Sequence, residues 1–130
     1  MRRSVTLVAL FALLLGALQI VALPQSRPEQ SSLQTQRGAR VFSERCAACH
    51  GVNLEGLVGP RLAGAGSTLK HKAVGDIFSF ISKNMPYGAP GSLTHDEYAA
   101  VMAFILKKNG RGSGNHTMSY GYLMTARTSI

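Results

Sequence analysis

The run Cys46-Ala47-Ala48-Cys49-His50 is the most informative stretch of this 130-residue chain. It contains the only two cysteines, which stand about one helical turn apart. Two thiols at that spacing can each add to one of the two vinyl groups of a haem, and the adjacent imidazole can reach the iron. The run therefore predicts one covalently bound c-type haem, attached through Cys46 and Cys49, with His50 as an axial iron ligand.

Three other interpretations of the cysteine pair are weaker. A redox dithiol of this spacing normally opens a helix that follows a strand, and no strand pattern precedes Cys46. A zinc site needs two more good ligands, and the sequence has no second Cys/His pair. A disulfide across two intervening residues would constrain almost none of the unfolded chain.

Residues 1–22 have the organisation of a secretory signal peptide. Arg2 and Arg3 precede an almost uninterrupted apolar run over residues 5–18, and Ile20-Val21-Ala22 is an imperfect cleavage site. The alternative is an uncleaved anchor, because the apolar stretch is just long enough to span a bilayer. Either way the rest of the chain is exported, so we expect a periplasmic protein, associated with the membrane if the leader is retained.

Size and charge restrict the possible functions. Without the leader the chain suffices for one small domain, whose apolar core a buried haem would complete. The formal net charge is +8, from 14 basic and 6 acidic side chains. The basic residues are scattered and the chain is exported, which argues against nucleic acid as a partner. A docking face for an acidic redox protein is compatible with this charge.

Three segments have the periodicity of helices that bury one face, namely residues 35–49, 73–84 and 94–109. The third is the clearest, because Thr94 and Glu97 have the spacing of a capping box. An all-α fold of about three main helices, with long loops around one haem, is therefore expected.

A glycine inside the first helix needs a reason. Gly38 costs about 1 kcal/mol relative to alanine at such a position. It suggests close approach by another helix, with Tyr98 and Val101 of the third helix as candidates to pack against Gly38 and Phe42. The alternative is simple fraying at the helix start.

The remaining segments lack periodicity. Residues 23–33 are rich in Pro, Gln, Ser and Arg, and we expect a flexible lead-in without core residues. Residues 51–67 contain five glycines and Pro60, and we expect a long loop that wraps the haem edge. Residues 111–130 are polar and irregular, and we expect a disordered tail. The domain itself is expected over residues 34–110.

Met85 is the best candidate for the second axial ligand. The proline at position 86 disfavours a helical conformation at Met85, so this methionine should lie in an extended segment. A thioether held near the iron would give a six-coordinate His/Met site. The alternative is plain core packing, which we expect instead for Met102, while Met118 and Met124 look incidental.

Pro60 and the other histidines complete the set of candidates. Pro60 has a carbonyl but no amide donor, so it could accept the remaining N–H of an iron-bound His50. An ordinary turn proline is the alternative. His71 is a rival sixth ligand, whereas His95 and His116 are expected to be solvated.

Together these features resemble class I monohaem cytochrome c over residues 34–110. The matching residues are Gly38 and Phe42, the cysteine run, Gly59-Pro60-Arg61-Leu62, Asn84-Met85-Pro86 and the helix with Tyr98. The resemblance implies a three-helix fold around the haem, Cys46 and Cys49 as attachment points, and His50 and Met85 as axial ligands. It also implies a hydrogen bond from His50 to the Pro60 carbonyl. Residues 85–91 are similar to cytochrome subunits and domains that serve periplasmic dehydrogenases, including quinoprotein alcohol dehydrogenases.

The expected function is one-electron transfer, from a periplasmic dehydrogenase towards the respiratory chain, with a cytochrome or terminal oxidase as acceptor. The protein is not expected to be an enzyme, because no general base or nucleophile accompanies the haem motif. One alternative is a five-coordinate haem protein with peroxidase or gas-sensing activity, which would require Met85 to stay off the iron. Another is a dedicated dehydrogenase subunit without an independent carrier role.

Overall fold

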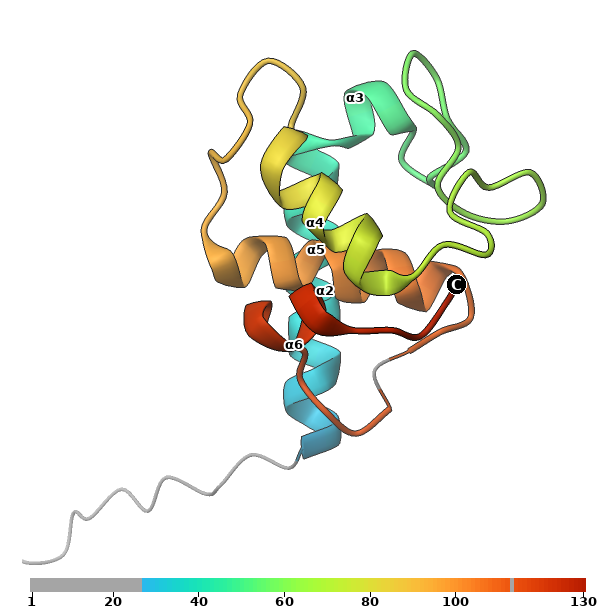
Figure 1. Ribbon diagram of the computed structural model, residues 1–130. Helices are drawn as coiled ribbons and strands as arrows, with labels where there is room; N and C mark the ends of the chain where they lie inside the picture. Colours follow the sequence, from blue (N-terminus) through green and yellow to red (C-terminus); the bar gives the residue numbers. More distant parts are fainter. Residues whose placement is uncertain (1–26, 113) are drawn as a thin grey trace, which may run out of the picture.

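The described part of the chain is all-α. A computed structural model describes residues 27–112 and 114–130. Its helices are α2 (Arg27–Arg45), α3 (Ala47–His50), α4 (Val74–Asn84), α5 (His95–Lys108) and α6 (Tyr120–Thr125) (Figure 1). No strand occurs in these ranges, only an isolated antiparallel bridge between Ala73 and Ser129. The expected fold class is confirmed, while the leader and residues 23–26 lie outside the described residues.

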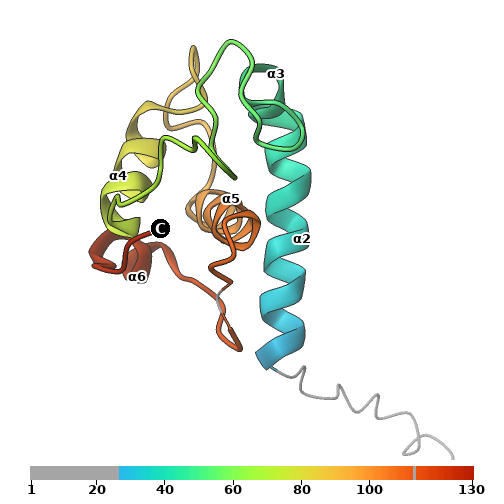
Figure 2. The ribbon, with the colours of Figure 1, turned by 90° about the vertical axis from the view of Figure 1, so that its right-hand side faces the viewer.

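α5 is the central helix of the core. Every residue from Tyr98 to Leu106 is buried, and Figure 2 looks nearly along α5, which lies between α2 and α4. The expected capping box is present, since the Thr94 amide donates to the Glu97 carboxylate at 2.8 Å and the Thr94 hydroxyl accepts from the Glu97 amide at 3.3 Å. The hydrogen bonds from the Thr94 amide and hydroxyl hold the pKa of the Glu97 carboxyl below its usual value.

α2 and α5 cross in direct backbone contact at Gly38. A Cβ at this position would overlap the carbonyl oxygen of Ala100 and lie 3.1 Å from the Cβ of Phe104. The close approach expected from the sequence is therefore confirmed. The nearest atoms, however, belong to Ala100 and Phe104 and not to Tyr98 or Val101.

The first helix differs from its expected bounds at both ends. α2 begins at Arg27 and not at residue 35, and Ser31 within it is buried, so a flexible lead-in over residues 27–33 is wrong. Pro28 is tolerated because the first amides of a helix have no intrahelical acceptor. The helix also breaks at Cys46, whose backbone (φ −127°, ψ −33°) separates α2 from α3.

The prediction of a disordered tail over residues 111–130 is also wrong. Residues 114–130 are not irregular throughout, because they include α6, and Leu123 within it is fully buried. The last residues then follow the start of α4, where Val74 and Gly75 donate their amides to Thr128 and Ala126 at 2.7 and 2.9 Å. Figure 1 shows α6 beside α4. The C-terminal segment is part of the fold.

Candidate haem-binding site

The five candidate site residues line one cavity. Cys46, Cys49, His50, Pro60 and Met85 surround a space of about 340 Å³, whose other walls are mainly apolar. The cysteines and His50 come from the break between α2 and α3 and from α3 itself, Pro60 from the long loop, and Met85 from the end of α4. Tertiary folding thus brings together residues that are up to 39 positions apart in sequence.

The imidazole of His50 is oriented by the loop. His50 is 9% exposed, and its Nδ1 lies 2.8 Å from the carbonyl oxygen of Pro60. A carbonyl can only accept, so Nδ1 is the donor in this hydrogen bond, and in the neutral ring the lone pair is then on Nε2. That is the tautomer in which Nε2 can bind a metal.

Gly59 allows the loop to lie against this ring. A Cβ at Gly59 would stand 2.8 Å from Cε1 of His50 and 2.9 Å from Nδ1. Such distances are too short for real carbon and nitrogen neighbours, so a larger residue would displace the imidazole or the loop. The sequence offered only a weak signal for this role, because Gly59 is one of several glycines in the segment.

Met85 is held by both of its backbone polar groups. It caps α4 in an extended conformation (φ −118°, ψ 154°), as expected for a residue before proline. Its amide donates to the carbonyl of Ile81 at 3.0 Å, and its carbonyl accepts from the Tyr98 hydroxyl at 2.6 Å. Nothing in the sequence pattern pointed to Tyr98 in this role, since it lies on the apolar stripe of its helix.

The two cysteines are half-buried and are not joined in a disulfide. Burial raises the pKa of the Cys46 thiol to about 11, although the neighbouring Arg45 guanidinium acts in the opposite direction. Cys46 is therefore protonated at neutral pH in the polypeptide alone. Within residues 27–112 and 114–130, no three His, Cys, Asp or Glu side chains are grouped as a metal site would need, so the zinc interpretation gains no support there.

The rival histidines lie elsewhere. His71 is exposed, is absent from the cavity lining, and donates its backbone amide to Ile130 at 2.9 Å. His95 is exposed as expected, and its ring also stacks on that of Tyr120 at a centroid distance of 4.0 Å.

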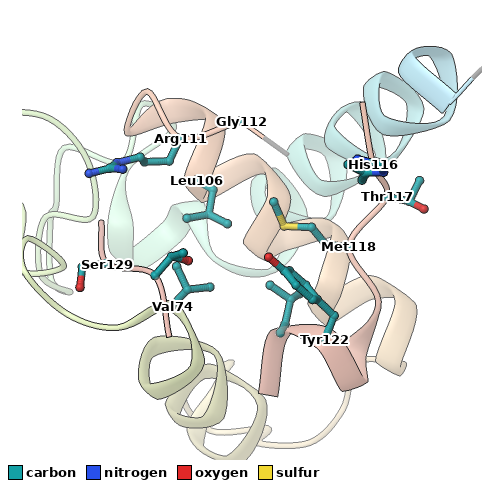
Figure 3. A pocket seen from close by; sticks show the side chains of 11 residues that line it. Val74, Leu106, Arg111, Gly112, His116, Thr117, Met118, Tyr122 and Ser129 are labelled. Carbon is teal, nitrogen blue, oxygen red and sulfur yellow. The ribbon is translucent and has the colours of Figure 1, made fainter. Parts of the chain in front are cut away.

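A second cavity, of about 470 Å³, is also lined by a histidine and a methionine, His116 and Met118 (Figure 3). Its other lining residues include residues of α5, α6 and the tail. Both come from one short segment, two positions apart, so they cannot face each other across a flat ring. No cysteine lines this cavity. It lacks the groups that would attach a haem.

The residues of the first cavity fit a haem. Its walls are mostly apolar, the two cysteines stand about one helical turn apart, and His50 and Met85 line the same space. Soft sulfur and imidazole donors are the groups that bind haem iron in electron-transfer proteins. An all-α fold around such a cavity defines the class of c-type cytochromes.

Comparison with known protein families also identifies a cytochrome c domain. Residues 33–105 match the family model described as "Cytochrome C oxidase, cbb3-type, subunit III". This match covers more than half of the chain, which therefore belongs to this family of cytochrome c domains. Its cofactor is covalently bound haem c, and its general function is electron transfer.

Individual relatives are more distant. The chain is 35% identical over 66 residues to cytochrome c-551 of Bacillus subtilis, covering 51% of this chain and 55% of that protein. It is 32% identical over 85 residues to a thiosulfate dehydrogenase of Psychrobacter arcticus, covering 55% and 25%. The chain thus spans only part of the length of either relative.

A solved structure has a similar fold. It is the crystal structure of the sulfane dehydrogenase SoxCD from Paracoccus pantotrophus, with a TM-score of 0.57 and 24% sequence identity. The superposition covers 72% of this chain and 52% of the SoxCD chain. At that identity the likeness concerns the fold alone. Among the helices at residues 27–112 and 114–130, none is long and apolar enough to cross a membrane.

Proposed function

We propose that this protein is a one-electron carrier whose haem is bound covalently by Cys46 and Cys49 and ligated by His50 and Met85. The observation that supports this most directly is the shared cavity. It is lined by His50 of α3, whose ring is hydrogen-bonded to the Pro60 carbonyl, and by Met85 at the end of α4, whose backbone carbonyl accepts from the Tyr98 hydroxyl. When bound, the haem iron supplies the reversible one-electron redox couple.

The chain's own residues set the properties of that couple. The Pro60 carbonyl fixes the tautomer and orientation of His50 and increases the basicity of its Nε2. The Met85 thioether favours reduced iron and so raises the potential. If His50 and Met85 both bound the iron, no iron position would be left for a substrate. No carboxylate lines the cavity to act as a general base.

We further propose that electrons arrive from a periplasmic dehydrogenase and leave towards the respiratory chain. Two similar proteins are described as a thiosulfate dehydrogenase and a sulfane dehydrogenase, and residues 85–91 resemble dehydrogenase-associated cytochromes. The net charge of +8, which becomes +6 without Arg2 and Arg3 of the leader, favours an acidic docking partner. Co-purification with a dehydrogenase would identify a subunit, whereas a free haem protein that the dehydrogenase reduces in solution would identify a mobile carrier.

The ligation is tested by replacing Met85 with alanine in the haem-loaded protein. The oxidised wild type should be low-spin and show a methionine–iron charge-transfer band in the near infrared, and Met85→Ala should abolish it. Met118→Ala, in the other cavity, and His71→Ala, at the rival ligand, are the matched controls and should both retain the band.

Two results would contradict the proposal. One is a band that persists in Met85→Ala. The other is a wild-type protein that is high-spin and binds carbon monoxide rapidly when reduced, because that behaviour belongs to the five-coordinate alternative with peroxidase or gas-sensing activity.

A further inference from the structure

We infer that Tyr98 is a positioning residue for the Met85 thioether, an assignment that rests on the His50/Met85 ligation proposed above. The Tyr98 hydroxyl donates to the Met85 carbonyl at 2.6 Å, and the tyrosine side chain is only 2% exposed. A short hydrogen bond from a buried side chain fixes its acceptor more firmly than a contact with water would. Tyr98 thereby links the backbone of Met85 directly to α5.

The segment that follows Met85 has little else to hold it in place. Residues 87–92 are all exposed, so burial stabilises them little. Their hydrogen bonds include the turns Ala89 to Pro86 (2.9 Å) and Ser92 to Ala89 (3.3 Å), and the contact of Arg45 Nη2 with Ser92 Oγ (2.8 Å). The turns are internal to the segment, and the arginine contact lies at its far end. At the end that carries the thioether, the Met85 amide is bonded to Ile81 of the preceding helix, and Tyr98 is the connection to α5.

Tyr98 itself stands on a firm support. It follows the capping box of Thr94 and Glu97, which fixes the first turn of α5. The next residues of α5, from Ala99 to Leu106, are buried in the core. A hydroxyl on such a support can keep the methionine backbone in place while the exposed segment moves. Without the hydroxyl, the thioether should leave the iron more often.

The test uses Tyr98→Phe in the haem-loaded protein, because this change removes one hydroxyl and keeps the buried ring. Carbon monoxide binding to the reduced protein measures how often the methionine leaves the iron. We expect binding to be about tenfold faster than in the wild type, a factor that corresponds to about 1.4 kcal/mol. The near-infrared band of the oxidised protein should also disappear at a lower temperature.

Two controls separate positioning from general weakening. Leu123→Ala removes a fully buried side chain of α6 that does not line the haem cavity, and it leaves Tyr98 and the helix cap beneath it in place. It should lower the overall stability yet change the carbon monoxide rate less than twofold. In a Met85→Ala background, Tyr98→Phe should have no effect on that rate, because there is no thioether left to position.

The outcomes are distinguishable from those of the ligation itself. A wild-type protein without the methionine band overturns the ligation, and this inference with it. A wild type with the band, combined with a Tyr98→Phe protein of unchanged rate, overturns only the role of Tyr98. So does a rate change that persists in the Met85→Ala background.

Discussion

Gly38→Ala is the change for which the structure makes the sharpest stability prediction. In an isolated helix this substitution is favourable by about 1 kcal/mol, because alanine has the higher helix propensity. In this protein the added Cβ would overlap the carbonyl oxygen of Ala100 and approach the Cβ of Phe104 to 3.1 Å. The first obstacle is backbone, which cannot rotate away as a side chain can. α2 and α5 would have to separate.

The expected cost follows from what that separation disturbs. The rings of Phe42 and Phe104 pack across the same interface with centroids 5.4 Å apart, and Phe42 is 1% exposed. Overpacking of a core costs about 3 kcal/mol at the upper end of its usual range. Subtracting the gain in propensity of about 1 kcal/mol leaves a net loss of about 2 kcal/mol. The unfolding equilibrium constant should rise about thirtyfold.

The assay is denaturant unfolding of the oxidised, haem-loaded protein, followed by far-ultraviolet circular dichroism. Gly121→Ala is the matched control, since Gly121 lies in α6 and a Cβ added there would meet nothing within 4 Å. The control should be neutral or stabilised by up to about 1 kcal/mol. If Gly38→Ala were as stable as Gly121→Ala, the proposed contact between the two helix backbones would be refuted.

Two further predictions concern the tail and the free thiols. Leu123→Ala should lower the free energy of unfolding by about 3 kcal/mol in a thermal unfolding experiment, because this side chain is 0% exposed. Tyr122→Ala, at an exposed side chain, should lower it much less. Equally small effects of the two substitutions would mean that the tail is not part of the core. In the haem-free Cys49→Ser polypeptide, the Cys46 pKa of about 11 leaves only about one thiolate in a thousand at pH 8. Since the raised pKa favours the thiol below pH 11, alkylation by iodoacetamide should accelerate about tenfold per pH unit up to that value, and a plateau near pH 9 would contradict it.

Local signals in the sequence predicted the features that depend on local chemistry. The capping box starts α5 as expected, and the proline after Met85 ends α4 where it should. Pro60 was the candidate acceptor for His50 because it has a carbonyl and no amide donor, and the structure contains a hydrogen bond between the two. Each of these depends on residues close in sequence, or on one donor that has one obvious acceptor.

The start of α2 and the tail were both wrongly predicted to lack structure, and the two errors have a common cause. The start of α2 is polar and shows no apolar stripe, and the tail is polar as well, so each alone reads as disordered. In the structure they stabilise each other, because the Gln34 side chain exchanges hydrogen bonds with the Met118 backbone at 2.6 and 2.8 Å. The Ser31 hydroxyl also donates to Gly114 at 3.2 Å. Partners more than 80 positions apart leave no periodicity for a sequence pattern to detect.

In the candidate site too, some features depend on local sequence and others on contacts between distant residues. The sequence predicts which residues are the iron ligands, but the relative position of these residues depends on α5. This helix meets α2 at Gly38 and holds the Met85 carbonyl through Tyr98. Its C-terminal cap is Asn109, whose side-chain amide donates to the carbonyl of Leu62 in the long loop at 2.9 Å.

The three contacts of α5 therefore connect the helix before the cysteines, the methionine segment and the loop that orients His50. A small shift of α5 would change the separation between the imidazole and the thioether without unfolding any helix. Substitutions at these contacts should accordingly alter the iron's ligation at lower temperature or denaturant concentration than they alter the helix content. The packing of α5 thus determines whether the two ligands meet the same iron.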